Sequence, residues 1–212
     1  MDIYLKSIIP EPLKDRVTRS EIWKKEIHFA SGRKIHITSP SAGGKTTLIS
    51  IIYGLRTDYS GEIFIDNNNA KSFTPEKWSF LRQNMLSIVF QNLRLFDHLT
   101  GMENIKIKAN LLKSAKDNQI VTIAEKLEIS NTLNKKIEIL SFGERQRIAI
   151  IRALVGSFKW LLLDEPFSHL DNATTRKVIE IIQSECKKKG SGIILAGLEK
   201  NNFFPYDHEV TL

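Results

Sequence analysis

Residues 39–47 read Ser39-Pro40-Ser41-Ala42-Gly43-Gly44-Lys45-Thr46-Thr47, a run of small residues that ends in Gly-Lys-Thr-Thr. The short run Lys34–Thr38 before it alternates like a β-strand, and Thr47–Leu55 after it suits a helix. A loop of small side chains between a strand and a helix lets successive backbone N–H groups point at a phosphate, and the helix adds its positive N-terminal end. The stretch therefore predicts a phosphate-binding loop in a parallel α/β core.

Individual residues of this loop have expected roles. Lys45 would neutralise the β- and γ-phosphates, and the Thr46 hydroxyl would bind Mg²⁺. Two positions depart from the usual pattern, because Ser39 replaces its first glycine and Ala42 stands where many such loops carry another. A plain glycine-containing turn is the alternative, but the placement between a strand and a helix favours binding. The expected nucleotide-binding residues here are Ser39, Pro40, Ser41, Ala42, Gly43, Gly44, Lys45, Thr46 and Thr47.

A second signal lies far downstream, where four apolar residues precede two carboxylates: Trp160-Leu161-Leu162-Leu163-Asp164-Glu165-Pro166. An uninterrupted apolar run predicts a buried strand of a parallel sheet, and ligands of such sheets bind at the carboxyl ends of the strands. Asp164 would hold Mg²⁺ through water, and Glu165 would polarise an attacking water. An Asp-Glu-Pro triplet can also simply open a turn, but the strand before it favours the catalytic interpretation.

A third signal is the start of a helix: Leu140-Ser141-Phe142-Gly143-Glu144-Arg145-Gln146-Arg147. Ser141 and Glu144 form the S-x-x-E pattern of a capping box, and Gly143 leaves room for a phosphate near the exposed N–H groups. The apolar stripe over Ile148–Val155 is also typical of an ordinary amphipathic helix with a good cap. The two interpretations are compatible, because the stripe can pack inward while Ser141, Gly143 and Glu144 face a nucleotide.

The loop, the helix start and the carboxylate strand occur in the order found in ABC (ATP-binding cassette) ATPases, and the chain resembles this family over nearly its whole length. The helix start resembles the ABC signature motif, Val89-Phe90-Gln91-Asn92 resembles the Q-loop, and Ser168-His169-Leu170-Asp171 resembles the D-loop. The resemblance implies that Gln91 contacts Mg²⁺ and acts in catalysis beside Glu165, with ATP and Mg²⁺ as cofactors. Alone, Gln91 is a polar residue after a strand and the D-loop run is equally a helix cap.

The resemblance also implies the architecture. We expect one nucleotide-binding domain over residues 1–212 with an α/β fold: a P-loop NTPase core with a mostly parallel sheet, an antiparallel β subdomain, and an inserted helical subdomain at approximately 93–155. The sequence pattern agrees, since residues 93–140 are dominated by helical periodicity.

Several further elements follow from local patterns. Glu21–Phe29 and the alternating Gly61–Asp66 read as strands of the opening section. Strand character returns at Gly192–Ala196, and the helix before it begins at the cap Asp171 and stops at Gly190.

Two departures from the family pattern bear on catalysis. The switch histidine of the family should follow the last core strand, but Leu198 stands there and His208 lies ten residues later. A leucine offers neither a donor nor a charge, so we expect slow hydrolysis. The family also stacks an early-loop aromatic residue on adenine, and Pro10–Asp15 contains none. Tyr4 and Trp23 are the remaining candidates, and both are expected to be strand residues.

Composition limits the remaining classes. No apolar stretch is long enough to cross a bilayer, and the start of the chain lacks the pattern of a signal peptide. The single cysteine, Cys186, cannot form an internal disulfide and lies at helical spacing from Ile179 and Ile182, which indicates a core residue. These observations predict a cytoplasmic protein, which the resemblance places on the inner face of the cell membrane.

The net charge is +7, which would suit a nucleic acid or an anionic membrane surface, but the basic residues are scattered and only Lys187–Lys189 forms a tight run, so an ordinary solvated surface is favoured and membrane proximity comes second. We therefore expect no nucleic-acid partner. The resemblance implies instead a second ABC subunit, in a homo- or heterodimer that encloses two ATP molecules, and an integral membrane permease-type partner that docks near Gln91–Phe96. The runs Phe90–Phe96 and Leu99–Ile105 are most similar to the lipoprotein-release, cell-division and macrolide-export branch.

The predicted function is ATP binding and hydrolysis that drives this membrane partner in transport or in transmembrane mechanical signalling. A slow or regulatory cassette is one alternative, because of Leu198. A non-transport ABC protein acting on nucleic acid is another. Such members carry two cassettes or a long coiled coil between the motifs, and neither feature is found here.

Overall fold

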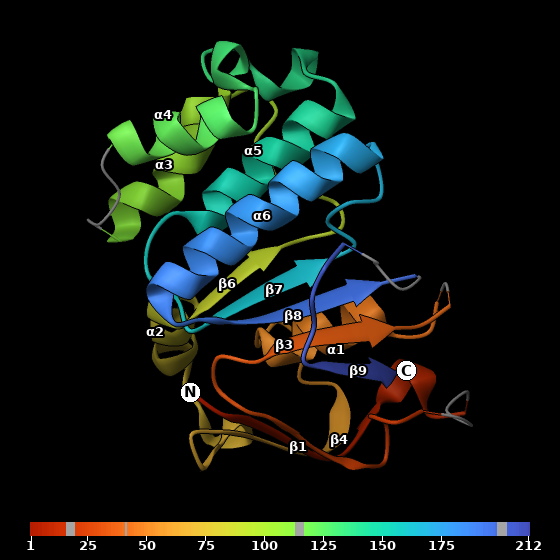
Figure 1. The fold of residues 1–212 in the computed structure, drawn as a ribbon. Helices are drawn as coiled ribbons and strands as arrows, with labels where there is room; N and C mark the ends of the chain where they lie inside the picture. The colour runs from red at the N-terminus through yellow and green to blue at the C-terminus, as the bar shows by residue number, and fades with distance from the viewer. Residues whose placement is uncertain (16–19, 41, 113–116, 199–202) are drawn as a thin grey trace.

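The computed structural model describes residues 1–15, 20–40, 42–112, 117–198 and 203–212. A central sheet is covered on one face by the helices α3 to α6, and a smaller sheet lies beyond its other face (Figure 1). The helix α1 lies between the two sheets and packs against both. This arrangement confirms the predicted α/β class with a parallel core, an antiparallel sheet and a helical region.

The central sheet has the strand order β6-β7-β8-β3-β9, and every neighbouring pair is parallel. Its strands are β3 (Lys34–Thr38), β6 (Leu86–Val89), β7 (Trp160–Asp164), β8 (Gly192–Gly197) and β9 (His208–Thr211). Because the strands are parallel, their carboxyl ends meet at one edge, where all the arrowheads lie in Figure 1. This edge is where a ligand of such a sheet binds.

The antiparallel sheet has the order β2-β1-β4-β5. Its strands are β1 (Ile3–Pro10), β2 (Glu26–Phe29), β4 (Tyr59–Ile65) and β5 (Asn68–Asn69). The strand predicted over Glu21–Phe29 is therefore wrong in its first half. The Ser20 hydroxyl accepts the N–H groups of Ile22 and Trp23 there, and Lys24 has a left-handed φ of 63°, so the chain turns. Trp23 is consequently not a strand residue.

Six α-helices occur in the described residues: α1 (Lys45–Ile52), α2 (Pro75–Asn84), α3 (Gly101–Leu112), α4 (Asp117–Lys126), α5 (Phe142–Leu154) and α6 (Asn172–Lys189). Short 3-10 turns lie at Glu11–Leu13, Ala70–Ser72, Ser130–Thr132 and Ile137–Ile139. As predicted, α6 follows the cap Asp171, which accepts the N–H of Thr174, and ends at the left-handed Gly190. None of the helices in the described ranges has the length and apolar character needed to cross a membrane.

The limits of α1 differ from the prediction of Thr47–Leu55. The helix begins two residues earlier because Gly44, at φ 100°, turns the chain directly from the loop into the first helical turn. It ends at Ile52 because Tyr53 caps it and Gly54 follows in a left-handed conformation at φ 71°. Only glycine adopts such backbone angles without strain, so the two glycines set the length of the helix.

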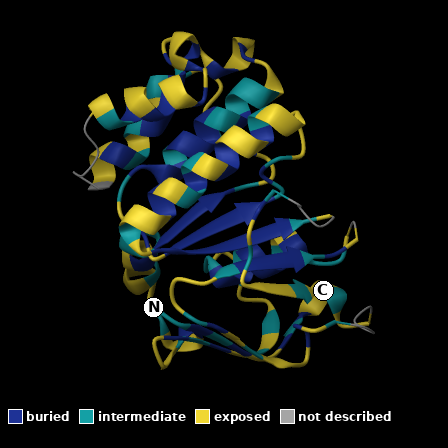
Figure 2. Ribbon diagram, viewed as in Figure 1, coloured by how far each residue is buried: buried dark blue, intermediate teal, exposed yellow. Residues whose placement is uncertain are grey.

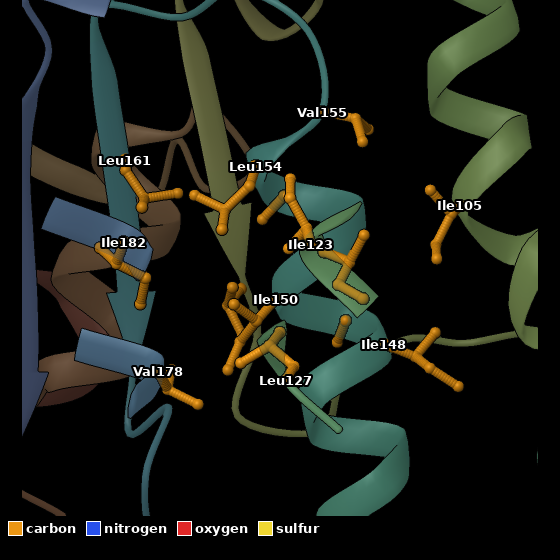
Figure 3. Close-up of a cluster of buried hydrophobic side chains, with 14 of the residues drawn as sticks. Ile105, Ile123, Leu127, Ile148, Ile150, Leu154, Val155, Leu161, Val178 and Ile182 are labelled. Carbon is orange, nitrogen blue, oxygen red and sulfur yellow. The ribbon is translucent and has the colours of Figure 1, made fainter. Parts of the chain in front are cut away.

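Two hydrophobic cores lie on opposite faces of the central sheet, and its strands β6, β7 and β8 are almost entirely buried, whereas the edge strand β9 is exposed (Figure 2). In β7, Leu161 and Leu163 face the helices, whereas Trp160 and Leu162 face α1 and the smaller sheet. Figure 3 shows Leu161 beside Leu154 of α5 and Ile182 of α6, in the same core as Ile123 of α4. Cys186 is buried in the same core, where burial raises the pKa of its thiol to about 12, as expected of a structural cysteine.

Candidate nucleotide-binding site

The loop between β3 and α1 has the backbone shape of an anion cradle. Gly44 is the N-cap of α1 and no side chain caps the helix, so the donors of its first turn are left for a ligand. A Cβ at Gly43 would lie 1.6 Å from the Ser39 hydroxyl oxygen and 3.1 Å from the Pro40 carbonyl oxygen, so a side chain there would force Ser39 to move. Ala42 adopts φ 63°, which explains why glycine is usual at this position. Ser41 lies outside the described residues.

Lys45 is held inside this loop. Its Nζ donates hydrogen bonds to the carbonyl oxygens of Ser39, at 2.8 Å, and Pro40, at 3.1 Å. The same ammonium lies 3.5 Å from Glu165 Oε1, and the side chain is only 5% exposed. A cation buried among oxygen atoms at the start of an open helix is suited to bind a phosphate oxygen.

Three further side chains meet at the carboxyl edge of the sheet. The Thr46 hydroxyl donates to Gln91 Oε1 at 3.3 Å, and Gln91 Nε2 donates to Glu165 Oε2 at 3.2 Å. They come from α1, from the loop after β6 and from the end of β7, far apart in sequence. The parallel register of β6 and β7 brings Gln91 next to Glu165.

Asp164 supplies the evidence for a cation. The residue is buried, and its Oδ1 atom has no hydrogen-bond partner. Burial raises the pKa of this carboxyl group, and the negative charge of Glu165 acts in the same direction. A buried carboxylate oxygen that lacks a partner, close to a threonine hydroxyl, is a donor set that Mg²⁺ prefers. The residues therefore fit a magnesium ion.

Glu165 itself has a left-handed backbone at φ 49°, unusual for a residue with a side chain. Its N–H donates to the Ala196 carbonyl of β8, and Gln146 of α5 donates to its carbonyl at 3.5 Å. Strained backbone of this kind is often stored at functional sites, where the surroundings fix it. The carboxylate is thereby held between Lys45 and Gln91.

The start of α5 is closed by its own side chains. The Glu144 N–H donates to Ser141 Oγ at 3.4 Å, and the Ser141 N–H donates to Glu144 Oε2 at 2.8 Å, so the capping box is present. The Ser141 hydroxyl also donates to Glu144 Oε2, at 2.7 Å, and this bond together with the one from the Ser141 N–H lowers the pKa of the Glu144 carboxyl. A Cβ at Gly143 would lie 3.6 Å from the His169 carbonyl, and the Phe142 and His169 rings have centroids 4.1 Å apart.

The structure thus divides the predicted site residues into two groups. It brings together Lys45, Thr46, Gln91, Asp164 and Glu165. It keeps the start of α5 apart, since no hydrogen bond or ion pair in the described ranges joins residues 141, 143 or 144 to the loop at 39–47.

The two predicted departures are also located. Leu198 directly follows β8 at the same edge of the sheet, and its side chain is 50% exposed. Trp23 is buried, and a Cβ at Gly44 would meet its ring at 3.1 Å and Leu13 at 2.6 Å. Trp23 therefore packs under the loop and is not open to a base. Tyr4 lies in β1, as expected, and stacks on His28.

Sequence reasoning missed two side chains of α5. Gln146 contacts the Glu165 carbonyl, and Arg152 donates to the carbonyls of Leu93 and Arg94, just after Gln91. The signal that could have found them is a polar residue within a helix that is otherwise mostly buried.

Comparison with known proteins gives the family. A family model described as ABC transporter matches residues 24–168. YxdL, an ABC transporter ATP-binding protein of Bacillus subtilis, is 38% identical over 76% of this chain and 64% of its own length. The chain thus spans a little under two thirds of that relative. The thiamine import ATP-binding protein ThiQ of Aliivibrio fischeri is 34% identical over 83% of this chain and 74% of its own length.

Solved structures share the fold. The dimeric structure of MJ0796, a bacterial ABC transporter cassette, has a TM-score of 0.74 at 24% identity and covers 92% of this chain and 87% of its own. A dimeric post-hydrolysis state of MJ0796 bound to ADP and Pi has a TM-score of 0.76 at 23% identity, over 98% and 96% of the two chains. With the phosphate loop, the buried carboxylate and these relatives in place, the chain belongs to the ABC transporter family as one of its ATP-binding cassettes.

Proposed function

We propose that the chain hydrolyses ATP, that it dimerises around ATP, and that it drives a separate membrane partner in transport or transmembrane mechanical signalling. The observation that carries this proposal is the position of the Glu165 carboxylate. It lies 3.5 Å from Lys45 Nζ and accepts a 3.2 Å hydrogen bond from Gln91. A carboxylate beside the phosphate lysine and next to a cation site is placed to accept a proton from water.

The loop at 39–47 would bind the phosphates through backbone N–H groups and Lys45, whose ammonium would exchange the Ser39 and Pro40 carbonyls for phosphate oxygens. Thr46, Gln91 and Asp164 would hold Mg²⁺, which neutralises phosphate charge when bound. Glu165 would orient the attacking water and take its proton, and the hydrogen bond from Gln91 would keep the carboxylate in place.

Ser141, Gly143 and Glu144 would contact nucleotide in the site of a second subunit. Within the described residues, no hydrogen bond or ion pair joins them to the loop of their own chain, which supports this, as does the exposure of Ser141. The N-terminus of α5 would add its positive end to that of the partner's α1 around one γ-phosphate.

The membrane partner would dock near Gln91–Phe96, and the Phe96 ring is half exposed there. In this proposal residues 1–212 form one nucleotide-binding domain, with 93–155 as its helical subdomain, at the cytoplasmic face of the cell membrane. The lipoprotein-release, cell-division and macrolide-export branch stays a prediction that rests on the runs Phe90–Phe96 and Leu99–Ile105, because the relatives above are YxdL and a thiamine import ATP-binding protein.

A slow or regulatory cassette is the second candidate, and the exposed Leu198 at the catalytic edge favours it. Both candidate functions include ATP binding and dimerisation, so they differ only in the rate of ATP turnover.

Glu165→Gln tests the main proposal. The substitution removes the proton acceptor but preserves the binding surfaces. In the presence of ATP the variant should therefore accumulate as a dimer, which wild-type protein forms only transiently. Size-exclusion chromatography with and without Mg-ATP measures this, and Lys45→Ala in the same background should abolish the dimer. A Glu165→Gln protein that binds ATP but stays monomeric at high concentration would argue against a homodimeric sandwich.

A further inference from the structure

Arg152, near the end of α5, holds the segment that follows Gln91. Its guanidinium donates one hydrogen bond to the Leu93 carbonyl, at 2.6 Å, and one to the Arg94 carbonyl, at 2.7 Å. Hydrogen bonds from a charged donor are the stronger kind, and the planar guanidinium can reach two neighbouring acceptors at once. The contact joins residues that are 58 and 59 positions apart in the chain.

The segment it holds is strained. Leu93 and Arg94 both have left-handed backbones, at φ 58° and 47°, although neither is glycine. A left-handed backbone brings the Cβ of such a residue too close to the following carbonyl oxygen, so two in succession need support from their surroundings. Part of this support comes from a turn hydrogen bond, which the Leu93 N–H donates to the Phe90 carbonyl at 2.9 Å. The Arg94 guanidinium also stacks on the Phe90 ring, at 4.0 Å.

Arg152 has little alternative to this contact. Burial lowers the pKa of its guanidinium, which nevertheless keeps its charge because its ordinary value is so high. Within the described part of the chain it forms no ion pair, so the two carbonyls are the partners of a cation withdrawn from water. Losing them would leave that cation poorly solvated, which favours the pinned turn.

The same helix reaches the catalytic edge a second time. Six residues before Arg152, Gln146 is buried and donates to the Glu165 carbonyl at 3.5 Å. The helix α5 therefore contacts both the backbone of Glu165 and the backbone that follows Gln91. The side chains of Gln91 and Glu165 are themselves joined by a 3.2 Å hydrogen bond.

We propose that Arg152 is a positioning residue for Gln91, and that α5 thereby fixes Gln91 relative to Glu165 within one chain. The inference rests on the proposed function, in which Gln91 contacts Mg²⁺ and holds Glu165. Because α5 begins at the capping box of Ser141, a displacement of its start would be transmitted to Gln91 through Arg152.

Amide hydrogen exchange tests the pin without nucleotide. Arg152→Met keeps the apolar stem and removes the donors, so the amides of residues 92–96 should exchange faster, while those of β8 should not change. Arg152→Lys keeps a charge that can reach one carbonyl and should fall between. Arg176→Met is the matched control, because Arg176 lies on another helix, α6, where its guanidinium stacks on the Phe203 ring at 4.2 Å. Unchanged exchange over 92–96 in Arg152→Met would overturn the proposal, whatever the protein hydrolyses.

Steady-state kinetics at saturating Mg²⁺ test the effect on Gln91. A displaced catalytic group costs between roughly tenfold and a hundredfold, so kcat should fall by that factor in Arg152→Met. The KM for Mg-ATP should stay within about twofold, because the phosphate loop is untouched. Arg152→Lys should recover part of kcat. An unchanged kcat alongside an active wild type would also overturn the inference.

The Mg²⁺ dependence of ATP binding separates this inference from the proposed function. If wild-type protein binds Mg-ATP without hydrolysing it, the proposed function fails. Arg152→Met should still need more Mg²⁺ than wild type or Arg176→Met for half-maximal ATP binding. Equal Mg²⁺ requirements would show that Arg152 does not position Gln91.

Discussion

The starts of α1 and α5 solve the same problem in opposite ways. Both helices leave backbone N–H groups without partners in their first turn. At α1 the N-cap is Gly44, which has no side chain to satisfy them. At α5 the N-cap is Ser141, and its side chain and that of Glu144 cap each other's backbone.

The difference extends to the other end of α5. Its last carbonyls accept hydrogen bonds from Lys108, at 3.4 Å to Ala153, and from Lys189, at 2.8 Å to Leu154. Cations near the C-terminus complement the helix dipole, so α5 is satisfied at both ends by this chain. The first turn of α1 therefore has no side-chain cap and is left open to a ligand in the proposed function, whereas the first turn of α5 is capped by its own side chains.

The largest expected effect concerns Leu198, at the carboxyl edge of the sheet where α1 begins. Leu198→His would place a donor at the carboxyl edge of the sheet, two residues after the Ala196 carbonyl that accepts the Glu165 N–H. It should raise turnover by about a hundredfold, the value of one well-aimed polar contact in such a site. Steady-state ATP hydrolysis measures it, with Leu198→Ala as the control for losing an exposed leucine. Fast turnover by wild-type protein that the histidine leaves unchanged would contradict the role of this position.

Lys45→Ala tests whether α1 is completed by phosphate. Mg-ATP at a hundred times its Kd should stabilise wild-type protein by about 2.7 kcal/mol, seen as a rise in Tm. The variant should lose most of this rise. Lys106→Ala, which removes a half-buried lysine paired with Asp117 on the helical side, should keep this rise in Tm. If wild type shows no rise at millimolar ATP, Ser39 and Ala42 have impaired the loop.

The contact of Lys108 with the C-terminal end of α5 can be tested by varying the pH. Burial lowers the pKa of its ammonium from 10.5 to about 7. Below pH 7 the Lys108 ammonium is charged in both the folded and the unfolded protein. Between about pH 7 and pH 10.5 only the unfolded chain keeps the proton. The unfolding free energy of wild-type protein therefore rises with pH over this range. The gain is at most about 1.4 kcal/mol per pH unit. Lys108→Met lacks it, so its stability relative to wild type should fall from pH 7 to pH 9 in urea unfolding. A pH-independent difference would show that Lys108 titrates normally.

The smallest effect concerns the capping box. Ser141→Ala should cost about 1 kcal/mol of unfolding free energy without nucleotide, the usual value of an N-cap. Ser184→Ala, at an exposed position inside α6, should be close to neutral because no cap is lost there. Equal stability of the two variants would mean that the start of α5 is as open as that of α1.

The features that could be predicted from the sequence depend on neighbours in the chain. The capping box links positions three apart, and the limits of β3, β7 and α6 follow from alternation, an apolar run and two terminal residues. The phosphate loop was recognised in the same way. The first half of Glu21–Phe29 was predicted wrongly, because the Ser20 hydroxyl outweighs the strand pattern there.

The sequence by itself determined the α/β class, the order of the motifs and the identity of the side chains at the catalytic edge. Tertiary structure decided which of them meet. Lys45, Gln91 and Glu165 come together only because parallel pairing aligns the ends of strands separated by whole helices. The contact of Arg152 with the carbonyls after Gln91 depends on how α5 packs, and a local pattern carries no information about packing between residues so far apart.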